Sequence, residues 1–187
     1  MENTQDLKKR LWRIIKDHAY HEGTITLSSG KTSHYYIDAR AITLHPEGAC
    51  LVGRIIFEMV RKDSVRAIGG PTLGADPMAA AVAIASFEQG QPLNAFLIRK
   101  TPKAHGRMLQ VEGPEIPEGA DVVLLDDVAT TGGSLIDSIA ILKKMGVSAK
   151  RAIVIVDREE GAAENLAVHN CHLSSIFRAS DFFSPKK

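Results

Sequence analysis

The sequence predicts an α/β fold in which a central, mostly parallel sheet is flanked by helices. From Val65 onward, short apolar segments alternate with helical patterns, which is the order of βαβ units. Residues 122–125 are apolar without interruption, as expected of a central strand that is buried on both faces. The 187 residues, 44% of them hydrophobic, suffice for a single domain with a sizeable core.

The N-terminal part is expected to contain a helix, two extended segments and a second helix. The first helix should be amphipathic and stop near Gly23, because its apolar residues recur at helical spacing. These residues are Leu7, Leu11, Ile14 and Ile15. The extended segments are expected at 24–27 and 34–39, around a turn at 28–30. Pro46 favours the start of the second helix.

The remaining elements follow the alternation in chain order. Strands are expected at 65–69, 95–99, 121–125, 151–156 and 173–177. Helices are expected at 76–87, 134–145 and 162–168. The interval 101–119 departs from this order, since it has three glycines, three prolines and little periodic apolar pattern. Unstructured loops of this length inside a compact domain are usually functional, so the interval is a candidate lid.

Bulk composition excludes several classes of function. A formal net charge of +1 gives no general attraction to nucleic acid or to an anionic membrane, so any anion site must be local. The N-terminus lacks the apolar core of a secretory signal, and no apolar run approaches the roughly 20 residues that cross a bilayer. Cys50 and Cys171 fit no metal-ligand spacing. The composition therefore indicates a cytoplasmic protein with reduced cysteines and without nucleic-acid or membrane partners.

Residues 124–134 carry the strongest functional pattern. Asp126 and Asp127 come directly after the apolar strand, at the carboxyl end of the sheet, where open α/β folds bind ligands. A turn rich in hydroxyls and glycines follows and leads into a helix; it contains Thr130, Thr131, Gly132, Gly133 and Ser134. The amides of such a turn favour a phosphate, whereas the carboxylates suit sugar hydroxyls or a hydrated Mg²⁺. The layout matches a ribose 5-phosphate.

A purely structural role for this segment is the main alternative. The two aspartates would then cap the following helix, and the glycines would only form a turn. One Asp and one Gly would favour that interpretation, but two acids, three hydroxyls and two glycines in this order favour a ligand site. The motifs of P-loops and of dinucleotide-binding loops are absent from the sequence.

Residues 126–134 resemble the motif with which type I phosphoribosyltransferases bind 5-phosphoribosyl 1-diphosphate (PRPP). By this resemblance the PRPP-binding residues are Asp126, Asp127, Val128, Ala129, Thr130, Thr131, Gly132, Gly133 and Ser134. The two acids would contact the ribose hydroxyls, and the loop would hold the 5′-phosphate. The resemblance also implies one domain over 1–187, with a hood from about 1–40 plus the C-terminal segment, and a mobile loop at about 101–119.

Residues 99–106 are similar to the catalytic loop of the orotate phosphoribosyltransferases. Their cationic or ionisable side chains are Arg99, Lys100, Lys103 and His105. Such a cluster suits a leaving pyrophosphate, whose charge grows as its bond to the ribose breaks. The alternative is a solvated basic loop. The resemblance places all four residues on PRPP, and it implies catalytic roles for Lys100, Lys103, His105, Asp126 and Asp127.

Two further segments point to orotate as the base. Arg158 follows a predicted strand, and its planar fork matches a carboxylate, which orotate carries and the other common bases lack. A surface ion pair with a neighbouring acid is the alternative for Arg158. Residues 27–38 resemble the family's hood, in which Tyr35 or Tyr36 would cover the pyrimidine while the other packs in the core. Thr130 would also contact orotate.

The sequence departs from the family pattern at two places. Ser28 stands where some members have a lysine, and the nearest lysine is Lys31. Residues 70–76 lack the Tyr-Lys pair that many members carry, although their glycines still allow backbone amides to approach a phosphate.

The resemblance implies Mg²⁺-dependent conversion of orotate and PRPP to orotidine 5′-monophosphate and pyrophosphate, in the synthesis of UMP. No protein ligands to a metal are expected, because Mg²⁺ would be held mainly by PRPP oxygens and water. A homodimer with shared active sites is implied. The alternatives are a phosphoribosyltransferase for another base, or a PRPP-sensing regulator with the same fold.

Overall fold

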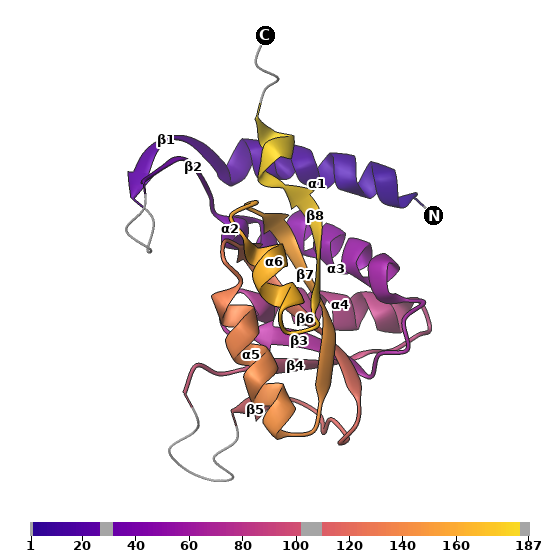
Figure 1. The fold of residues 1–187 in the computed structure, drawn as a ribbon. Helices are drawn as coiled ribbons and strands as arrows, with labels where there is room; N and C mark the ends of the chain where they lie inside the picture. The colour runs from indigo at the N-terminus through magenta and orange to yellow at the C-terminus, as the bar shows by residue number, and fades with distance from the viewer. Residues whose placement is uncertain (1, 27–31, 102–109, 184–187) are drawn as a thin grey trace.

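The computed structural model describes residues 2–26, 32–101 and 110–183, and within them two sheets (Figure 1). The larger sheet has six strands in the order β5-β4-β3-β6-β7-β8. They are β3 (Ala67–Pro71), β4 (Asn94–Ile98), β5 (Val111–Glu112), β6 (Asp121–Ala129), β7 (Ser148–Asp157) and β8 (His172–Arg178). Every pairing is parallel except that of β5 with β4. The predicted α/β class with a mostly parallel sheet is therefore confirmed.

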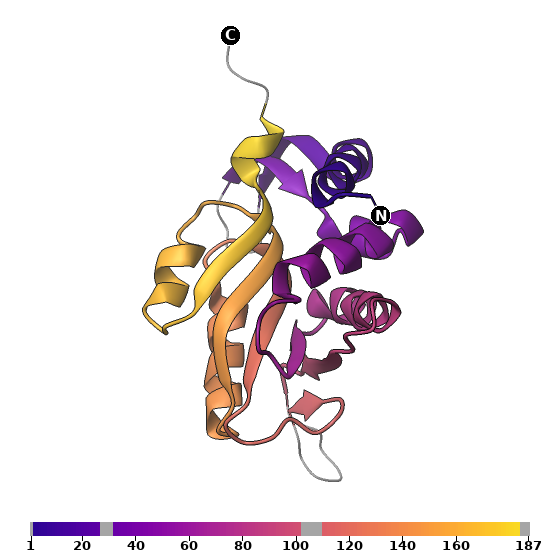
Figure 2. The same cartoon turned by 90° about the vertical axis from the view of Figure 1, so that its right-hand side faces the viewer.

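Helices cover both faces of this sheet (Figures 1 and 2). One face packs against α3 (Pro46–Val60) and α4 (Ala75–Glu88), and the other against α5 (Gly133–Lys144) and α6 (Ala162–Ala167). The side chains of β6 alternate between the two layers, since Val123 and Leu125 join the first core and Val122 and Leu124 the second. A strand buried on both faces explains the uninterrupted apolar run.

The two ends of the described chain meet above the sheet. Helix α1 (Thr4–His18) is followed by the antiparallel pair β1 (Tyr20–Thr26) and β2 (Thr32–Ile37), and then by α2 (Ala39–Thr43). The C-terminal 3₁₀ turn η1 (Ala179–Phe182) packs on α1 and β1. The ring of Phe182 stacks on Trp12 and Tyr20, with centroids 6.2 and 6.0 Å apart, and the Trp12 indole donates to the Asp181 carbonyl.

The predicted ends of the first helix and of the strand at 121–125 are wrong. Helix α1 ends at His18, not near Gly23, because Tyr20 enters β1 to stack on Phe182 and Tyr35. Strand β6 continues to Ala129, so the two adjacent aspartates lie within the strand and not in a turn after it. The reason is that the parallel ladder with β7 continues through this segment.

The interval 101–119 contains more structure than predicted, within its described part. Residues 111–112 form β5 on the edge of β4, and Val111 and Ile116 pack against the second core. Helix α2 and the turn η1 were also not predicted. Cys50 is exposed and Cys171 is buried. None of the helices within the described ranges is both long and apolar enough to cross a membrane.

Candidate active site

The candidate site lies at the carboxyl edge of the large sheet, where β3, β6 and β7 end side by side. Open α/β sheets bind ligands at this edge. The main chains of β6 and β7 are joined there by a hydrogen bond from the Arg158 amide to the Ala129 carbonyl, 2.9 Å long. The predicted phosphate loop and the predicted base reader therefore lie next to each other.

The carboxylates of Asp126 and Asp127 bond to their own strand and to the following helix. An Asp126 oxygen accepts from the Asp127 amide at 3.0 Å, and an Asp127 oxygen accepts from the Val128 amide at 2.8 Å. The hydroxyl of Ser134 donates to the other Asp126 oxygen at 2.6 Å. Ser134, predicted as a phosphate donor, is thus the link between the acids and α5.

Burial disfavours the charged forms of both acids. It raises the pKa of Asp126 to about 7; the hydrogen bond from Ser134 lowers this pKa and the charge of Asp127 raises it further. Burial likewise raises the pKa of Asp127, while the Val128 amide and the charge of Arg40 lower it. Two neighbouring carboxyls with raised pKa values are typical of a site that receives positive charge from a ligand.

The N-terminus of α5 has no side chain on its first amides. Its N-cap is Gly132, at φ 78°, and no side-chain capping bond is present, so the aspartates do not cap this helix. The preceding loop is held from behind, because the Asn165 side chain donates to the Thr131 carbonyl at 2.9 Å. A Cβ added to Gly133 would meet nothing within 4 Å. The open amides and the helix dipole together suit an anion.

The turn between β3 and α4 lies directly against the two acids. A side chain on Gly74 would collide with carboxylate oxygens of both Asp126 and Asp127. The amide of Thr72 donates to the Ile98 carbonyl at 2.9 Å, and the Thr72–Leu73 peptide is cis. Residues 70–76, which lack the family's Tyr-Lys pair, therefore present backbone to the site.

Arg158 is buried at the end of β7, with 6% of its side chain exposed. Its Nε donates to Glu160 at 2.8 Å, and its guanidinium carbon lies 4.7 Å from the centre of the Tyr35 ring. The predicted alternative, an ion pair with a neighbouring acid, is thus present, but it is not a surface pair. A buried, oriented guanidinium is suited to bind a carboxylate.

The hood brings Tyr35 to Arg158 and turns Tyr36 elsewhere. Tyr35 stacks on Tyr20 and meets the edge of Phe183, with centroids 5.0 Å apart. Tyr36 stacks on His21. Which tyrosine covers the base remains a prediction, since Tyr35 contacts the arginine and also packs on the core.

The predicted lid is described only at its stem. Arg99 pairs with Glu112 at 3.5 Å, and the Gln110 side chain donates to the carbonyls of Arg99 and Lys100. Both cations are exposed at the end of β4, separated from β6 by β3. Lys103 and His105 lie outside the described residues, as do Ser28 and Lys31 of the hood.

Sequence reasoning missed several residues of the site. Arg40 follows β2 and acts on Asp127, Gly74 packs on the acids, and Phe183 meets Tyr35. Glu160 was covered only by the alternative of a surface ion pair between Arg158 and a neighbouring acid. Only Gly74 carried a local signal, because a glycine before a helix at a strand end often marks a close backbone approach.

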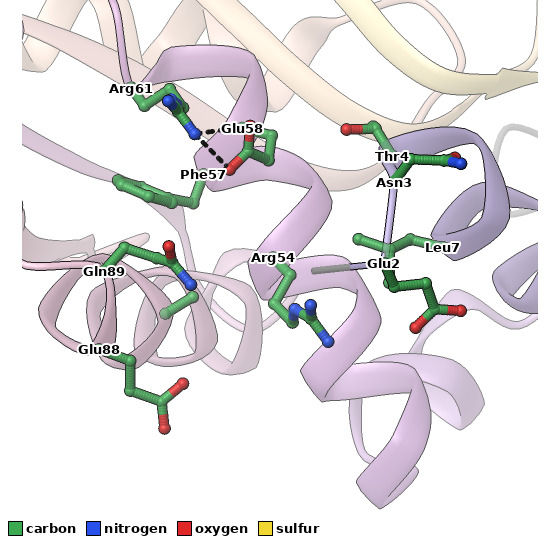
Figure 3. Close-up of a pocket in the computed structure, with 11 residues that line it drawn as sticks. Glu2, Asn3, Thr4, Leu7, Arg54, Phe57, Glu58, Arg61, Glu88 and Gln89 are labelled. Carbon is green, nitrogen blue, oxygen red and sulfur yellow. Dashed lines mark hydrogen bonds and ion pairs between the residues drawn. The ribbon is translucent and has the colours of Figure 1, made fainter.

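A cavity of about 280 Å³ lies at the opposite edge of the sheet (Figure 3). It is bounded by the start of α1 and by the C-terminal parts of α3 and α4, which lead into the amino ends of strands. Arg54 and Arg61 face it together with Glu2, Glu58 and Glu88, so it has no excess of positive charge for a phosphorylated ligand.

The chain offers few ligands to a metal. In the three described ranges, no group of three His, Cys, Asp or Glu side chains converges in a way that would hold an ion. Asp126 and Asp127 supply carboxylate oxygens, whereas Mg²⁺ takes six oxygen ligands and retains several waters. These residues fit Mg²⁺ only if a ligand and water complete its coordination.

Known proteins resemble this chain over nearly its whole length. A family model described as a phosphoribosyl transferase domain matches residues 38–181. The orotate phosphoribosyltransferase of Thermosynechococcus vestitus is 42% identical, over 96% of this chain and 95% of its own. That of Aquifex aeolicus is 40% identical, over 93% and 96%.

Solved structures agree with these relatives. The Mycobacterium tuberculosis orotate phosphoribosyltransferase in complex with Fe(III) dicitrate superposes with a TM-score of 0.83, at 34% identity, over 94% of this chain and 98% of that one. Its complex with PRPP gives a TM-score of 0.78 at 31% identity, with the same two coverages, 94% and 98%.

Proposed function

Since the chain belongs to the phosphoribosyltransferase family, and within it to the orotate phosphoribosyltransferases, we propose that the edge formed by β3, β6 and β7 is its active site. The reaction converts orotate and PRPP to orotidine 5′-monophosphate and pyrophosphate. One observation supports the site above all others. The end of β6 joins the buried Asp126 and the half-buried Asp127 to an uncapped helix N-terminus, and a backbone bond ties it to a buried arginine.

The phosphoribosyl group is held by β6 and α5 in this proposal. The first amides of α5 and the hydroxyls of Thr130 and Thr131 bind the 5′-phosphate, because they form an open donor set at the positive end of a helix. Asp126 and Asp127 accept from the ribose hydroxyls. Main chain at Val128, Ala129, Gly132 and Gly133 borders the sugar phosphate.

Arg158 identifies the base through its carboxylate. The guanidinium is buried beside the Tyr35 ring, so it is oriented before the base arrives. Tyr35 or Tyr36 covers the flat pyrimidine, and Thr130 contacts it. Adenine, guanine and uracil lack the carboxylate and leave the arginine without its ligand.

Charge stabilisation drives the chemical step. Orotate nitrogen attacks C1 of the ribose while pyrophosphate leaves, so positive charge grows on the sugar and negative charge on the leaving group. Asp126 and Asp127 stabilise the positive charge on the sugar. The negative charge on the leaving pyrophosphate is stabilised by Arg99, Lys100, Lys103 and His105. The backbone turn around Gly74, which lies against the two acids, borders the pyrophosphate in this proposal. Closure of the loop over the site would exclude water.

Mg²⁺ is proposed as the cofactor, held by PRPP oxygens and water near Asp126 and Asp127. When bound it neutralises phosphate charge and orients the leaving group. The two carboxyls favour a cation here, because each has a raised pKa and Asp126 forms no ion pair with a described residue. Omission of Mg²⁺ is expected to abolish turnover.

A homodimer is supported by one uncovered helix face. Helix α4 is apolar on nearly all sides, yet Ile84 and Phe87 are exposed on it, as is Leu73 in the preceding turn. A helix that is apolar all round is normally buried. A second copy that covers this face would lie beside the turn 70–74 and next to the active site. Light scattering should report a dimer, and Ile84→Asp with Phe87→Asp should give monomers.

The decisive experiment is a panel of bases with PRPP and Mg²⁺, followed by pyrophosphate release. Orotate is expected to be the only good acceptor, at least a hundredfold better in kcat/KM than uracil or the purines. Comparable rates with a base that has no carboxylate would point to another phosphoribosyltransferase. PRPP binding without turnover of any base would point to a regulator with this fold.

A further inference from the structure

The positive charge of Arg158 is already shared with an acid of the protein. Glu160 accepts from Arg158 Nε at 2.8 Å, and the two side chains are 6% and 30% exposed. Solvent therefore screens this pair weakly, so the charge of Glu160 acts on whatever else the arginine binds.

The turn that carries Arg158 is acidic as a whole. Asp157, Glu159 and Glu160 surround one arginine. Burial is the main cause that raises the pKa of the adjacent Tyr35; Arg158 lowers this pKa, and all three acids raise it further. The field at this end of β7 is thus partly negative. An anionic base must bind against that field, and Arg158 is the residue of this turn that attracts it.

We propose that Glu160 is a positioning residue that sets the selectivity of Arg158. Its hydrogen bond fixes the orientation of the guanidinium, and its negative charge weakens the binding of any carboxylate to that guanidinium. This inference rests on the proposed role of Arg158 in binding the base. A ligand that offers only a negative charge gains little binding free energy from a guanidinium whose charge is already shared with Glu160. A ligand that also fills the space beside Tyr35 gains enough from packing to be retained.

Charge and orientation can be separated by substitution. Glu160→Gln keeps an oxygen that accepts from Arg158 Nε, so the orientation is retained, but it removes the negative charge. The carboxylate of the base then binds a guanidinium that no longer shares its charge with Glu160. Two carboxylates on one guanidinium lie within about 5–6 Å of each other, so removal of one should strengthen binding of the other by about tenfold.

Glu159 provides a matched control in the same turn. It carries the same charge, but its carboxylate accepts from the Ser180 amide at 3.0 Å and not from the arginine. The backbone of Glu159 has a φ of 61°, and Glu159→Gln changes neither side-chain length nor branching. This variant should change the affinity by no more than about twofold, because its charge points to the C-terminal turn.

The test compares two nucleotides that differ only in the base carboxylate. Calorimetry would measure the dissociation constants of orotidine 5′-monophosphate and UMP for the wild type, Glu160→Gln and Glu159→Gln. In Glu160→Gln, the constant for orotidine 5′-monophosphate should fall about tenfold while that for UMP changes less than about twofold. A purely structural role of Glu160 would change both constants alike.

The outcomes separate this inference from the proposed function. If the wild type prefers orotidine 5′-monophosphate to UMP but Glu160→Gln leaves that preference unchanged or weaker, the role given to Glu160 is wrong. If the wild type shows no preference at all, the proposed role of Arg158 fails first. Melting temperatures confirm that both variants are folded.

Discussion

The ends of β6 and β7 lie side by side, yet they hold their charges in different ways. At the end of β6, the buried Asp126 and the half-buried Asp127 accept hydrogen bonds from backbone amides and one hydroxyl, and both have raised pKa values. At the end of β7, Arg158 is buried with an acid and an aromatic ring already in contact. Among the described residues, the acids of β6 form no ion pair, whereas Arg158 forms one with Glu160.

The difference indicates how each end responds to a ligand. The acids of β6 gain stabilisation when positive charge arrives, so their protonation should change on binding. The arginine of β7 is held by side chains before any ligand arrives, so binding there should depend on fit more than on a change of charge. Substitutions at each of the two strand ends can test this contrast.

Neutralising an acid of β6 should separate activity from stability. Asp127→Asn should lower kcat/KM for orotate by about 10²–10³-fold, because a stabiliser of the ribosyl cation is lost. The melting temperature should stay the same or rise, since a buried charge is removed at the same time. Steady-state kinetics and thermal melts check both. Unchanged kinetics would remove Asp127 from the mechanism.

Truncating the arginine of β7 should affect one substrate only. Arg158→Ala should raise the orotate KM by about 10- to 100-fold and change the PRPP KM by less than about threefold. Arg178→Ala is the matched control, because Arg178 is exposed at the end of the next strand and should affect neither KM. Equal effects of Arg158→Ala on both substrates would exclude it as the base reader.

A methyl group added at the start of α5 should test directly whether the phosphate of PRPP binds there. Nothing in the protein lies within 4 Å of a Cβ added to Gly133, so Gly133→Ala should leave the melting temperature unchanged. Its PRPP KM should rise about tenfold if the phosphate approaches this amide closely. Gly132→Ala should instead destabilise the fold by about 1 kcal/mol, because Gly132 has a φ of 78°. A normal PRPP KM for Gly133→Ala would move the phosphate elsewhere.

The buried acid of β6 should also give stability an unusual pH dependence. The pKa of Asp126 is raised from 3.8 to about 7 in the folded protein, so the folded state binds the extra proton more tightly than the unfolded state. Its contribution is complete below the unfolded pKa and is lost as pH rises from about 4 to 7. Urea denaturation at pH 5 and pH 8 should show a smaller pH effect in Asp126→Asn. An identical pH profile in both proteins would contradict the raised pKa.

The alternation of elements and the place of the two acids near a strand end were predictable from local sequence. Apolar runs and helical spacing located the strands and helices of the large sheet, because both faces of this sheet are buried by the chain's own helices. The two adjacent aspartates lie near the carboxyl end of β6, as that pattern predicted. These features depend on residues that are close together in the chain.

The features that were missed depend on distant residues. Strand β6 runs on through two aspartates, which disfavour strands, because β7 supplies the ladder partners. Helix α1 ends early because Tyr20 stacks on Phe182 from the C-terminal turn. The surroundings of Arg158 come from the hood and its own turn, so its burial has no local pattern. The roles of Lys103 and His105 stay predictions.

The backbone hydrogen bond from the Arg158 amide to the Ala129 carbonyl limits the length of a ligand that spans the two strand ends. It fixes the spacing between the proposed phosphate site after β6 and the proposed base site after β7, so a bound nucleotide must match that spacing. A homologue of orotidine 5′-monophosphate with one additional methylene between phosphate and sugar would be too long for this spacing. Such a compound should engage either end but not both.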